Sequence, residues 1–244
     1  MDKIVIKASD LGRLAMDDFC PRCFWFLRKY PIINEHPYFT PPPGIISILD
    51  SYTKNSVFAF FIEEKKLPNW LYDKIKKKNL DVKNIVKPKK FEVKVDNFLL
   101  AGIPDAILEL NDGSFFIIDY KTSVLSEGQK KLFPLYKTQL LAYAYLGRKN
   151  GLEVKHIALV YLEPKYKLDL VEYINLSRDL LTLEFQCHVM FIEDWDPKTL
   201  ESEIENMVRK VGNILMRESP PNGRKNCKGC LELGKWLANL SSKI

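Results

Sequence analysis

The chain has 244 residues, of which 46% are hydrophobic and 12% aromatic. This is enough apolar material for one large domain, or for a domain with a small satellite. No run of 18 apolar residues occurs, so the sequence predicts no membrane-spanning helix. The 37 basic and 31 acidic side chains leave a formal charge of +6, which is compatible with a polyanionic partner but does not require one.

Five cysteines occur, and four of them form two C-x-x-C pairs near opposite ends of the chain. The pairs are Cys20 with Cys23 and Cys227 with Cys230, and the fifth cysteine is Cys187. An odd number of cysteines, together with an N-terminus that lacks the layout of a signal peptide, argues against a secreted disulfide scaffold. We therefore expect a cytoplasmic protein.

In chain order, residues 3–7 are predicted to form a short strand or an ordered arm, and Ser9 is predicted to cap a helix. The segment Phe19–Tyr30 is aromatic and basic. Pro41–Gly44 ends an irregular loop, because proline donates no backbone hydrogen bond. A long helix is predicted over Ile45–Glu64. One broad apolar face of that helix would contain Ile45, Ile48, Leu49, Tyr52, Val57, Phe60 and Phe61.

The next segment, Lys65–Lys90, is rich in lysine. The lysines cluster at Lys74, Lys76, Lys77 and Lys78, while Trp70, Leu71 and Ile75 anchor part of the segment. Such a run is either a solvated face or an edge that contacts DNA, and both interpretations stay open.

Two hairpins are predicted in the middle of the chain. The first spans Phe91–Ile103, with its turn at Asp96–Asn97. The second joins Asp105–Leu110 to Phe115–Lys121 through Asn111–Gly113, a sequence typical of tight hairpin turns.

After the second hairpin, Lys130–Leu146 is predicted to be a helix that stops at Gly147. The alternating segment Val154–Leu162 is predicted to be a strand, and so is Lys167–Ile174.

The last third of the chain is predicted to be mainly helical. Ser177 would cap a helix that continues through Phe185–Phe191. A long helix would run from Trp195 to about Met216, and a tail helix would follow around Leu231–Leu240.

The second hairpin brings chemically useful side chains together. Its strands lie about 5 Å apart, so Asp105 and Asp119 can converge. Side chains alternate along a strand, so Asp119 and Lys121 share a face while Tyr120 points away. Paired carboxylates suit Mg²⁺ or Mn²⁺, and a lysine beside them can orient or deprotonate a water. An ordinary hairpin with a charged tip remains the alternative.

The sequence Pro104-Asp105 followed by Asp119-Tyr120-Lys121 resembles the PD-(D/E)xK nuclease superfamily. An acidic helix residue, Asp50, precedes this pattern, and a helix with Gln139 and Tyr143 follows it. This order resembles the RecB-like branch of the superfamily. That branch includes DNA-repair exonuclease domains and the CRISPR-adaptation nucleases that carry an iron–sulphur cluster. The resemblance covers roughly residues 9 to 235. It implies an α/β fold with a restriction-endonuclease-like core, in which helices flank a central mixed sheet.

The resemblance also implies roles for individual residues. Asp105, Asp119 and the backbone carbonyl of Tyr120 would be metal ligands. Lys121 would position the attacking water and the scissile phosphate. The bound cation would offset the negative charge that develops when a phosphodiester is attacked.

Gln139 and Tyr143 match the glutamine–tyrosine helix motif of the RecB-like branch. They lie four residues apart and therefore share one helix face. The resemblance implies that they orient the catalytic lysine or contact the DNA backbone. A half-buried polar pair on an amphipathic helix is the alternative.

The chain departs from the RecB-like pattern at one metal ligand. That branch usually places a histidine on the early helix, but here the histidines are His36, His156 and His188, which we interpret as structural. Asp50 either replaces the histidine as a metal ligand or is a solvent-facing partner of Lys54.

The cysteines form the second constellation. Two C-x-x-C pairs, each beside basic residues, predict a site of four sulphurs. Such a site suits an iron–sulphur cluster or zinc. The resemblance favours a [4Fe-4S] cluster, but the family more often has one early and three late cysteines, so structural Zn²⁺ stays open, as do reduced thiols. The surrounding basic platform for a DNA strand would contain Trp25, Arg22, Arg28, Lys29, Arg224, Lys225 and Lys228. Cys187 is predicted to belong to the core.

We therefore expect a single domain over residues 1–244, with a cysteine-clamped helical accessory lobe formed by about 9–30 and 217–244. The predicted function is Mg²⁺- or Mn²⁺-dependent DNA cleavage at ends or in single strands, with protein partners in a DNA-repair or CRISPR complex. A catalytically inactive DNA-binding module and a zinc-stabilised adaptor protein are the alternatives.

Overall fold

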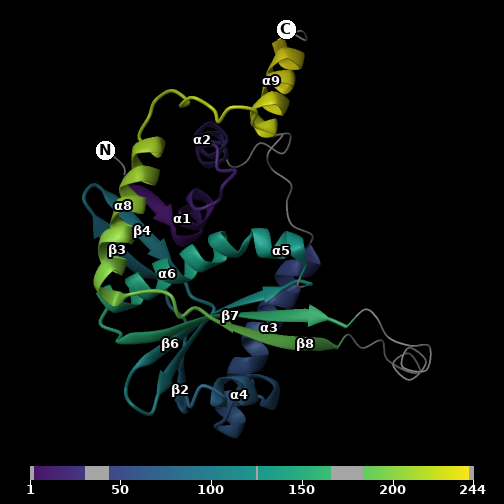
Figure 1. Cartoon of the computed structure of the whole chain (residues 1–244), viewed down its shortest axis with the longest axis vertical. Helices are drawn as coiled ribbons and strands as arrows, with labels where there is room; N and C mark the ends of the chain where they lie inside the picture. Colours follow the sequence, from purple (N-terminus) through teal and green to yellow (C-terminus); the bar gives the residue numbers. More distant parts are fainter. Residues whose placement is uncertain (1–2, 31–43, 125, 166–183, 242–244) are drawn as a thin grey trace, which may run out of the picture.

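The computed structural model describes residues 3–30, 44–124, 126–165 and 184–241. Figure 1 shows two β-sheets with helices packed around them. The larger sheet has the strand order β2-β5-β6-β7-β8. These strands are β2 (Val82–Val86), β5 (Ala106–Leu110), β6 (Phe115–Thr122), β7 (Val154–Pro164) and β8 (Phe185–Phe191). Strands β6 and β7 run parallel and the other neighbours antiparallel, so this sheet is mixed.

The smaller sheet joins the N-terminus to the first predicted hairpin. Strands β3 (Phe91–Val95) and β4 (Phe98–Gly102) are antiparallel, and β1 (Ile4–Lys7) pairs in parallel with β4. The connecting turn places Asp96 at φ 52°, a left-handed conformation that aspartate tolerates better than most residues. Both hairpins predicted from the sequence are thereby confirmed.

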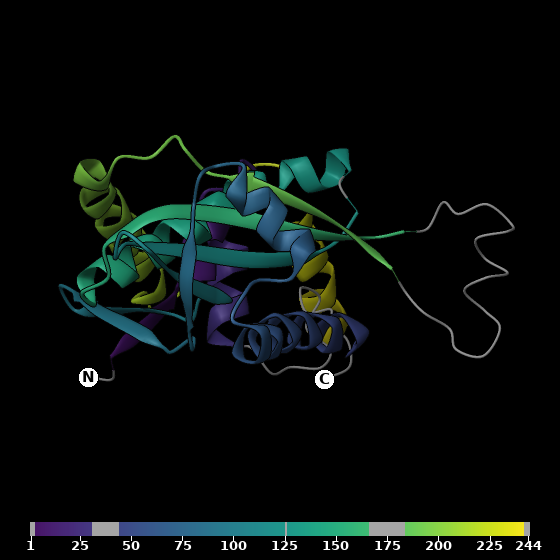
Figure 2. The same ribbon diagram turned by 90° about the horizontal axis from the view of Figure 1, so that it is seen from below.

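Helices cover both faces of the large sheet. On one face lies α6 (Phe133–Lys149), with α1 (Ala8–Leu14) and α8 (Pro197–Leu215) packed against it. On the other face lie α3 (Gly44–Glu64) and α4 (Asn69–Lys76), as Figure 2 shows from below. The remaining described helices are α2 (Pro21–Lys29), α5 (Glu127–Lys131) and α9 (Lys228–Ser241). Among the described residues, every helix is too short or too polar to span a bilayer.

The apolar run at the start of β6 explains this three-layer arrangement. Successive strand residues point to opposite faces, so Ile117 enters the core beneath α6 while Phe116 and Ile118 enter the core beneath α3 and α4. A strand buried on both faces needs a continuous apolar sequence rather than an alternating one. Strand β6 is therefore fixed from both sides, and its C-terminal residues are positioned by a rigid element.

One predicted helix is wrong. Residues Phe185–Phe191 form β8, which pairs antiparallel with β7 from Ala158 to Pro164. In this strand Cys187 and Val189 point into the core beneath α4, so pairing and packing decide the conformation. The burial of Cys187 confirms its assignment to the core. The predicted strand over 167–174 and the cap at residue 177 lie outside the described residues.

Two details of the predicted helices also need correction. The N-terminal half of the expected apolar face on α3 is exposed, with Ile48 at 63%, and the buried face begins at Val57, where the helix reaches the sheet. Helix α6 does not stop at Gly147 but runs to Lys149. The turn after it contains Gly151 at φ 87°, which is the position that requires glycine.

Candidate active site and cysteine cluster

The C-terminal end of β6 carries the core of the site. Asp119 and Lys121 face α6, while the side chain of Tyr120 turns into the opposite core. Asp119 is 1% exposed, and the Nζ atom of Lys121 lies 2.5 Å from its Oδ2 atom. The carboxylate is thus held away from solvent with one cation beside it.

Asp105 joins this pair from the segment between β4 and β5. Its Oδ2 atom accepts a hydrogen bond of 2.8 Å from the backbone N–H of Tyr120. Its carboxyl group also lies within hydrogen-bonding reach of the carboxyl group of Asp119. The hairpin therefore brings two carboxyl groups and a lysine to one point.

The two carboxyl groups repel each other in a poorly solvated place. Burial raises the pKa of Asp119, the ammonium group of Lys121 lowers it, and the nearby charge of Asp105 raises it again. The net result is a pKa well above the usual value of a carboxylic acid. The single positive charge of Lys121 therefore does not offset the effects of burial and of the neighbouring Asp105.

Helix α3 supplies a second lysine, Lys54, which the sequence indicated only as a partner of Asp50. The Nζ atom of Lys54 lies 2.6 Å from Asp50 Oδ2 and 2.7 Å from Asp105 Oδ1. Burial lowers the pKa of Lys54, but hydrogen bonds and charge from Asp105 and Asp50 raise it overall. Asp50 therefore contacts the site through Lys54. The spacing of Asp50 and Lys54 was visible in the sequence, but the approach of Asp105 depends on the packing of α3 against the sheet.

Helix α6 closes the opposite side. The side-chain amide of Gln139 donates a hydrogen bond of 2.8 Å to the hydroxyl group of Tyr143, which is buried. Burial, followed by the charges of Asp119 and Asp105, raises the pKa of Tyr143, so this phenol stays protonated. Gly102 makes room for the tyrosine, because a Cβ atom there would lie 2.7 Å from its ring.

Tyr136 is a further site residue that the sequence reasoning missed. Its ring lies one helical turn before Gln139, with its centroid 4.5 Å from the Nζ atom of Lys121. A cation over an aromatic face is stabilised by the negative charge density of the ring. The i, i+3 spacing from Tyr136 to Gln139 is the sequence signal that would have revealed it.

The donor set suits a hard divalent cation. Asp105 and Asp119 offer carboxylate oxygens, the ligands that Mg²⁺ and Mn²⁺ prefer. The buried Oδ2 atom of Asp119 has no hydrogen-bond partner among the described residues, although it lies beside the ammonium group of Lys121. Asp50 is less well placed, because within the described ranges only the four paired cysteines bring three or more ligand atoms to within 4.8 Å of one another.

Comparison with known proteins bears on this geometry. The family model of the PD-(D/E)XK nuclease superfamily matches residues 59–231. The chain belongs to the PD-(D/E)XK nuclease superfamily. No curated protein matches the chain. A solved structure titled "Crystal structure of SSO0001" is similar over 90% of this chain and 80% of its own, at 18% sequence identity and a TM-score of 0.40.

The matched range of this PD-(D/E)XK chain contains the hairpin residues and the glutamine–tyrosine pair, but it begins after Asp50 and Lys54. The mixed sheet with helices on both faces is the restriction-endonuclease-like core of the superfamily. Superfamily members are usually nucleases that use divalent metals and act on nucleic acid.

This superfamily member also gathers its two C-x-x-C pairs at one place. Cys20 and Cys23 lie at the start of α2, and Cys227 and Cys230 lie at the start of α9. Their sulphur atoms approach to 3.5 Å between Cys20 and Cys230 and also between Cys23 and Cys227. Four thiol sulphurs within 4.8 Å of one another can bind a metal ion or cluster.

Backbone groups favour the thiolate form of Cys20, whereas burial and the neighbouring Cys20 raise the pKa of Cys230 to about 11. Burial opposes ionisation of Cys20, but N–H groups of Arg224 and Cys23 and neighbouring thiols lower its pKa to about 6. Gly223 permits this packing, since a Cβ atom there would lie 2.6 Å from the sulphur of Cys230. Thiolates are the form that binds metals.

The expected platform around the cluster is only partly present. Trp25 is 3% exposed, and its ring N–H donates to the carbonyl of Arg217, so it cannot stack on a nucleobase as predicted. Arg28 is engaged by Asp10 and by the carbonyl of Val5.

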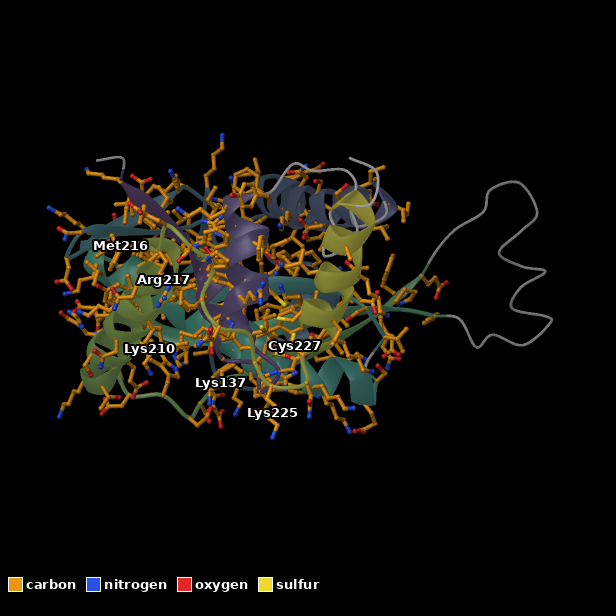
Figure 3. All side chains as sticks on the ribbon, turned by 90° about the horizontal axis from the view of Figure 1, so that it is seen from above. Lys137, Lys210, Met216, Arg217, Lys225 and Cys227 are labelled. Atoms are coloured by element: carbon orange, nitrogen blue, oxygen red, sulfur yellow. The ribbon has the colours of Figure 1, made fainter. Side chains whose placement is uncertain are left out.

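Basic side chains also line the upper surface, and one of them, the exposed Lys225, belongs to the expected platform. Figure 3 looks onto the face on which Lys210, Arg217 and Lys225 are seen together with Cys227. These three residues are exposed, so this face offers positive charge beside the cluster.

The two histidines in the described part of the chain take no part in either site. His156 packs edge-on against Phe116, and burial lowers its pKa. His188 lies 3.4 Å from Glu163 on the neighbouring strand. The third, at position 36, lies outside the described residues.

Proposed function

We propose that this chain is a Mg²⁺- or Mn²⁺-dependent deoxyribonuclease that hydrolyses phosphodiester bonds at DNA ends or in single strands. The observation that carries the proposal is the meeting of Asp105, Asp119 and Lys121 at the end of β6. Two carboxyl groups that repel each other in a buried place are stabilised when a divalent cation binds between them.

The metal would be held by Asp105, Asp119 and the backbone carbonyl of Tyr120. Asp50 would join them after Lys54 moves away from Asp105. When bound, the ion offsets the negative charge of the phosphodiester and lowers the pKa of a water. The hydrogen bond from Tyr120 N–H to Asp105 fixes one ligand in place before the ion arrives.

Lys121 would act on the phosphate and the attacking water. Its ammonium group lies next to Asp119 and over the ring of Tyr136, so its position is set from two sides. A positive charge held in a poorly solvated site stabilises an anionic transition state more strongly than one in water. Gln139 and Tyr143, joined by their hydrogen bond, would orient Lys121 or contact the DNA backbone.

The cysteine cluster would hold a [4Fe-4S] cluster, with structural Zn²⁺ as the alternative. The resemblance to RecB-like nucleases with iron–sulphur clusters supports the first, and the two-and-two arrangement of ligands supports the second. The exposed basic residues beside it would guide a DNA strand toward the carboxylates. We further propose a single domain with a cysteine lobe from about 9–30 and 217–244, in a cytoplasmic protein that works with partners in DNA repair or CRISPR adaptation.

Cleavage assays test this function directly. Single- and double-stranded DNA, labelled at either end, are incubated with Mn²⁺ and the wild type or the Lys121→Ala variant. The variant is expected to lose roughly 100-fold or more in rate. Lys155→Ala is the matched control, because this exposed lysine pairs with Asp112 at the opposite end of β6.

The possible results separate three functions. Cleavage by the wild type and the control, but not by Lys121→Ala, supports the nuclease. Bound but intact DNA indicates a catalytically inactive DNA-binding module. A protein that neither binds nor cleaves DNA indicates a zinc-stabilised adaptor. Equal rates for Lys121→Ala and wild type contradict the assigned role of the lysine.

A further inference from the structure

A cavity of about 430 Å³ lies directly beside the carboxylate site, between α3 and the large sheet. It shares two residues with that site, Asp105 and Lys54, whose charged groups are 2.7 Å apart. Anything in this cavity is therefore adjacent to a phosphate held at the end of β6.

The walls of this cavity are mainly apolar. Val57 and Ile85 are buried in them, and Phe58 contributes a half-buried aromatic ring. A few polar groups stand among them, notably Asn55 and the exposed Lys87. Apolar walls with few polar groups, at this volume, are typical of sites for small organic ligands.

A buried hydroxyl group in this part of the protein lacks a partner. Tyr120 lines the cavity and is 4% exposed, and its hydroxyl group makes no hydrogen bond to any described residue. Buried polar groups almost always have partners. The hydroxyl oxygen is closed off from solvent in this conformation, so a ligand in the cavity would bond to it after a small shift of the ring. The proposed mechanism uses the backbone of Tyr120 but leaves this hydroxyl group without a role.

The charges around the cavity indicate what kind of ligand enters. Lys54 and Lys87 place two cations on its wall, one toward the carboxylates and one toward solvent. A planar aromatic group attached to a phosphate fits this arrangement, because its ring can stack on Phe58 while its phosphates face the lysines.

We propose that this cavity binds the nucleobase next to the scissile phosphate, with the base unstacked from its strand. The inference rests on the proposed nuclease function and names the part of the substrate that the site selects. A base held there cannot pair with a complementary strand. The site would therefore favour single strands and frayed ends, where unstacking is easiest.

Oligonucleotides with one missing base test this proposal. A fluorescein-labelled single-stranded deoxythymidine oligonucleotide is bound in Ca²⁺, in place of Mn²⁺, to prevent cleavage. In a matched series, one abasic residue is moved along the strand. Binding is expected to weaken about tenfold at one position and little elsewhere. The position is compared with the cut site mapped separately in Mn²⁺.

Two conservative variants connect that signal to the cavity. Phe58→Leu keeps the apolar wall but loses the ring, and Tyr120→Phe removes one hydroxyl group that has no partner to lose. Both are expected to bind the intact oligonucleotide about three- to tenfold more weakly and to reduce the abasic effect. Tyr145→Phe is the matched control, because that buried tyrosine bonds to Glu205 away from the cavity.

The outcomes distinguish this inference from the nuclease proposal. If the wild type cleaves DNA but no abasic position matters, or both variants bind like the wild type, the cavity proposal is overturned and the nuclease stands. If DNA stays intact but the abasic signal disappears in both variants, the base site stands in a DNA-binding module. A uniform loss at every abasic position also overturns the proposal, since it reflects general stacking along the strand.

Discussion

The Asp119→Asn substitution should make the metal-free protein more stable while abolishing the proposed nuclease activity. Burial and the charge of Asp105 raise the pKa of Asp119 from 3.8 to about 7 despite the adjacent Lys121. Each unit of such a rise costs the folded state about 1.4 kcal/mol at a pH well above the pKa. The rise from 3.8 to about 7 therefore corresponds to about 4 kcal/mol. Because the amide leaves Lys121 without its ion pair, we expect a gain on the order of 2 to 4 kcal/mol near pH 8.

The pH dependence gives the sign of this effect. Between about pH 4 and pH 7 the folded protein binds a proton that the unfolded chain has released, so wild-type stability falls as the pH rises through this window. The amide of the Asp119→Asn variant does not titrate in this range, so the variant should lack this slope. The two proteins should then be closest in stability near pH 4 and furthest apart above pH 7.

Thermal unfolding at several pH values measures both expectations. The buffers are freed of divalent ions with a resin rather than with a dissolved chelator, so that the metal proposed for the cysteine cluster is not stripped. The variant should melt roughly 5 to 15 °C above the wild type at pH 8. Asp112→Asn, at the exposed turn before β6, should give no rise, because hydrogen bonds from Ser114 lower the pKa of that carboxyl group. A lower melting temperature for Asp119→Asn at pH 8, or an unchanged pH slope, would refute the reasoning.

The remaining predictions concern packing, counter-charge and the cysteines. Lys54→Met removes the cation between the carboxylates of Asp50 and Asp105, so it should lower metal-free stability by about 1 to 2 kcal/mol. Because this lysine competes with the metal for Asp105, the variant should bind Mn²⁺ more tightly in calorimetry. Weaker Mn²⁺ binding would contradict that competition. Gly212→Ala should destabilise by about 1 to 3 kcal/mol in urea unfolding, since a Cβ atom would lie 2.4 Å from a buried ring, whereas Gly234→Ala in open space on α9 should stabilise by about 0.5 to 1 kcal/mol. Equal effects at both glycines would contradict the close packing of Gly212 against the ring of Phe98. Cys227→Ser should reduce bound iron or zinc in metal analysis and lower the melting temperature, while Cys187→Ser should keep the metal content unchanged.

The sequence was most informative where local rules decide the structure. The Asn111–Gly113 turn and the apolar run of β6 specify one hairpin, and its register follows from the strand period of two. That is why the positions of Asp105 and Asp119 could be anticipated without knowing the rest of the fold. The sequence also placed the start of the long helix α8 near Trp195, and the structure adds that the side chain of Asp196 caps it by accepting from the N–H of Lys198.

The sequence was least informative where contacts between segments far apart in the chain decide the local structure. Residues 185–191 form a strand because β7 offers an unpaired edge, which no local pattern reveals. Trp25 looked like an exposed platform because it lies among basic residues, but its ring N–H is used by a carbonyl 192 residues away. The contact of Lys54 with Asp105 joins a helix to the segment just before β5 and depends on how α3 packs against the sheet.

The cysteine cluster joins the two ends of the chain, and this affects how the protein is made. Cys20 meets Cys230, which follows it by 210 residues along the chain. During translation the early pair must wait, with its thiols exposed to oxidants and stray metals, until almost the whole polypeptide has left the ribosome. Insertion of the proposed metal would therefore be a late event in the maturation of this protein, and a transcript truncated before the last C-x-x-C would yield a product whose two ends are never joined.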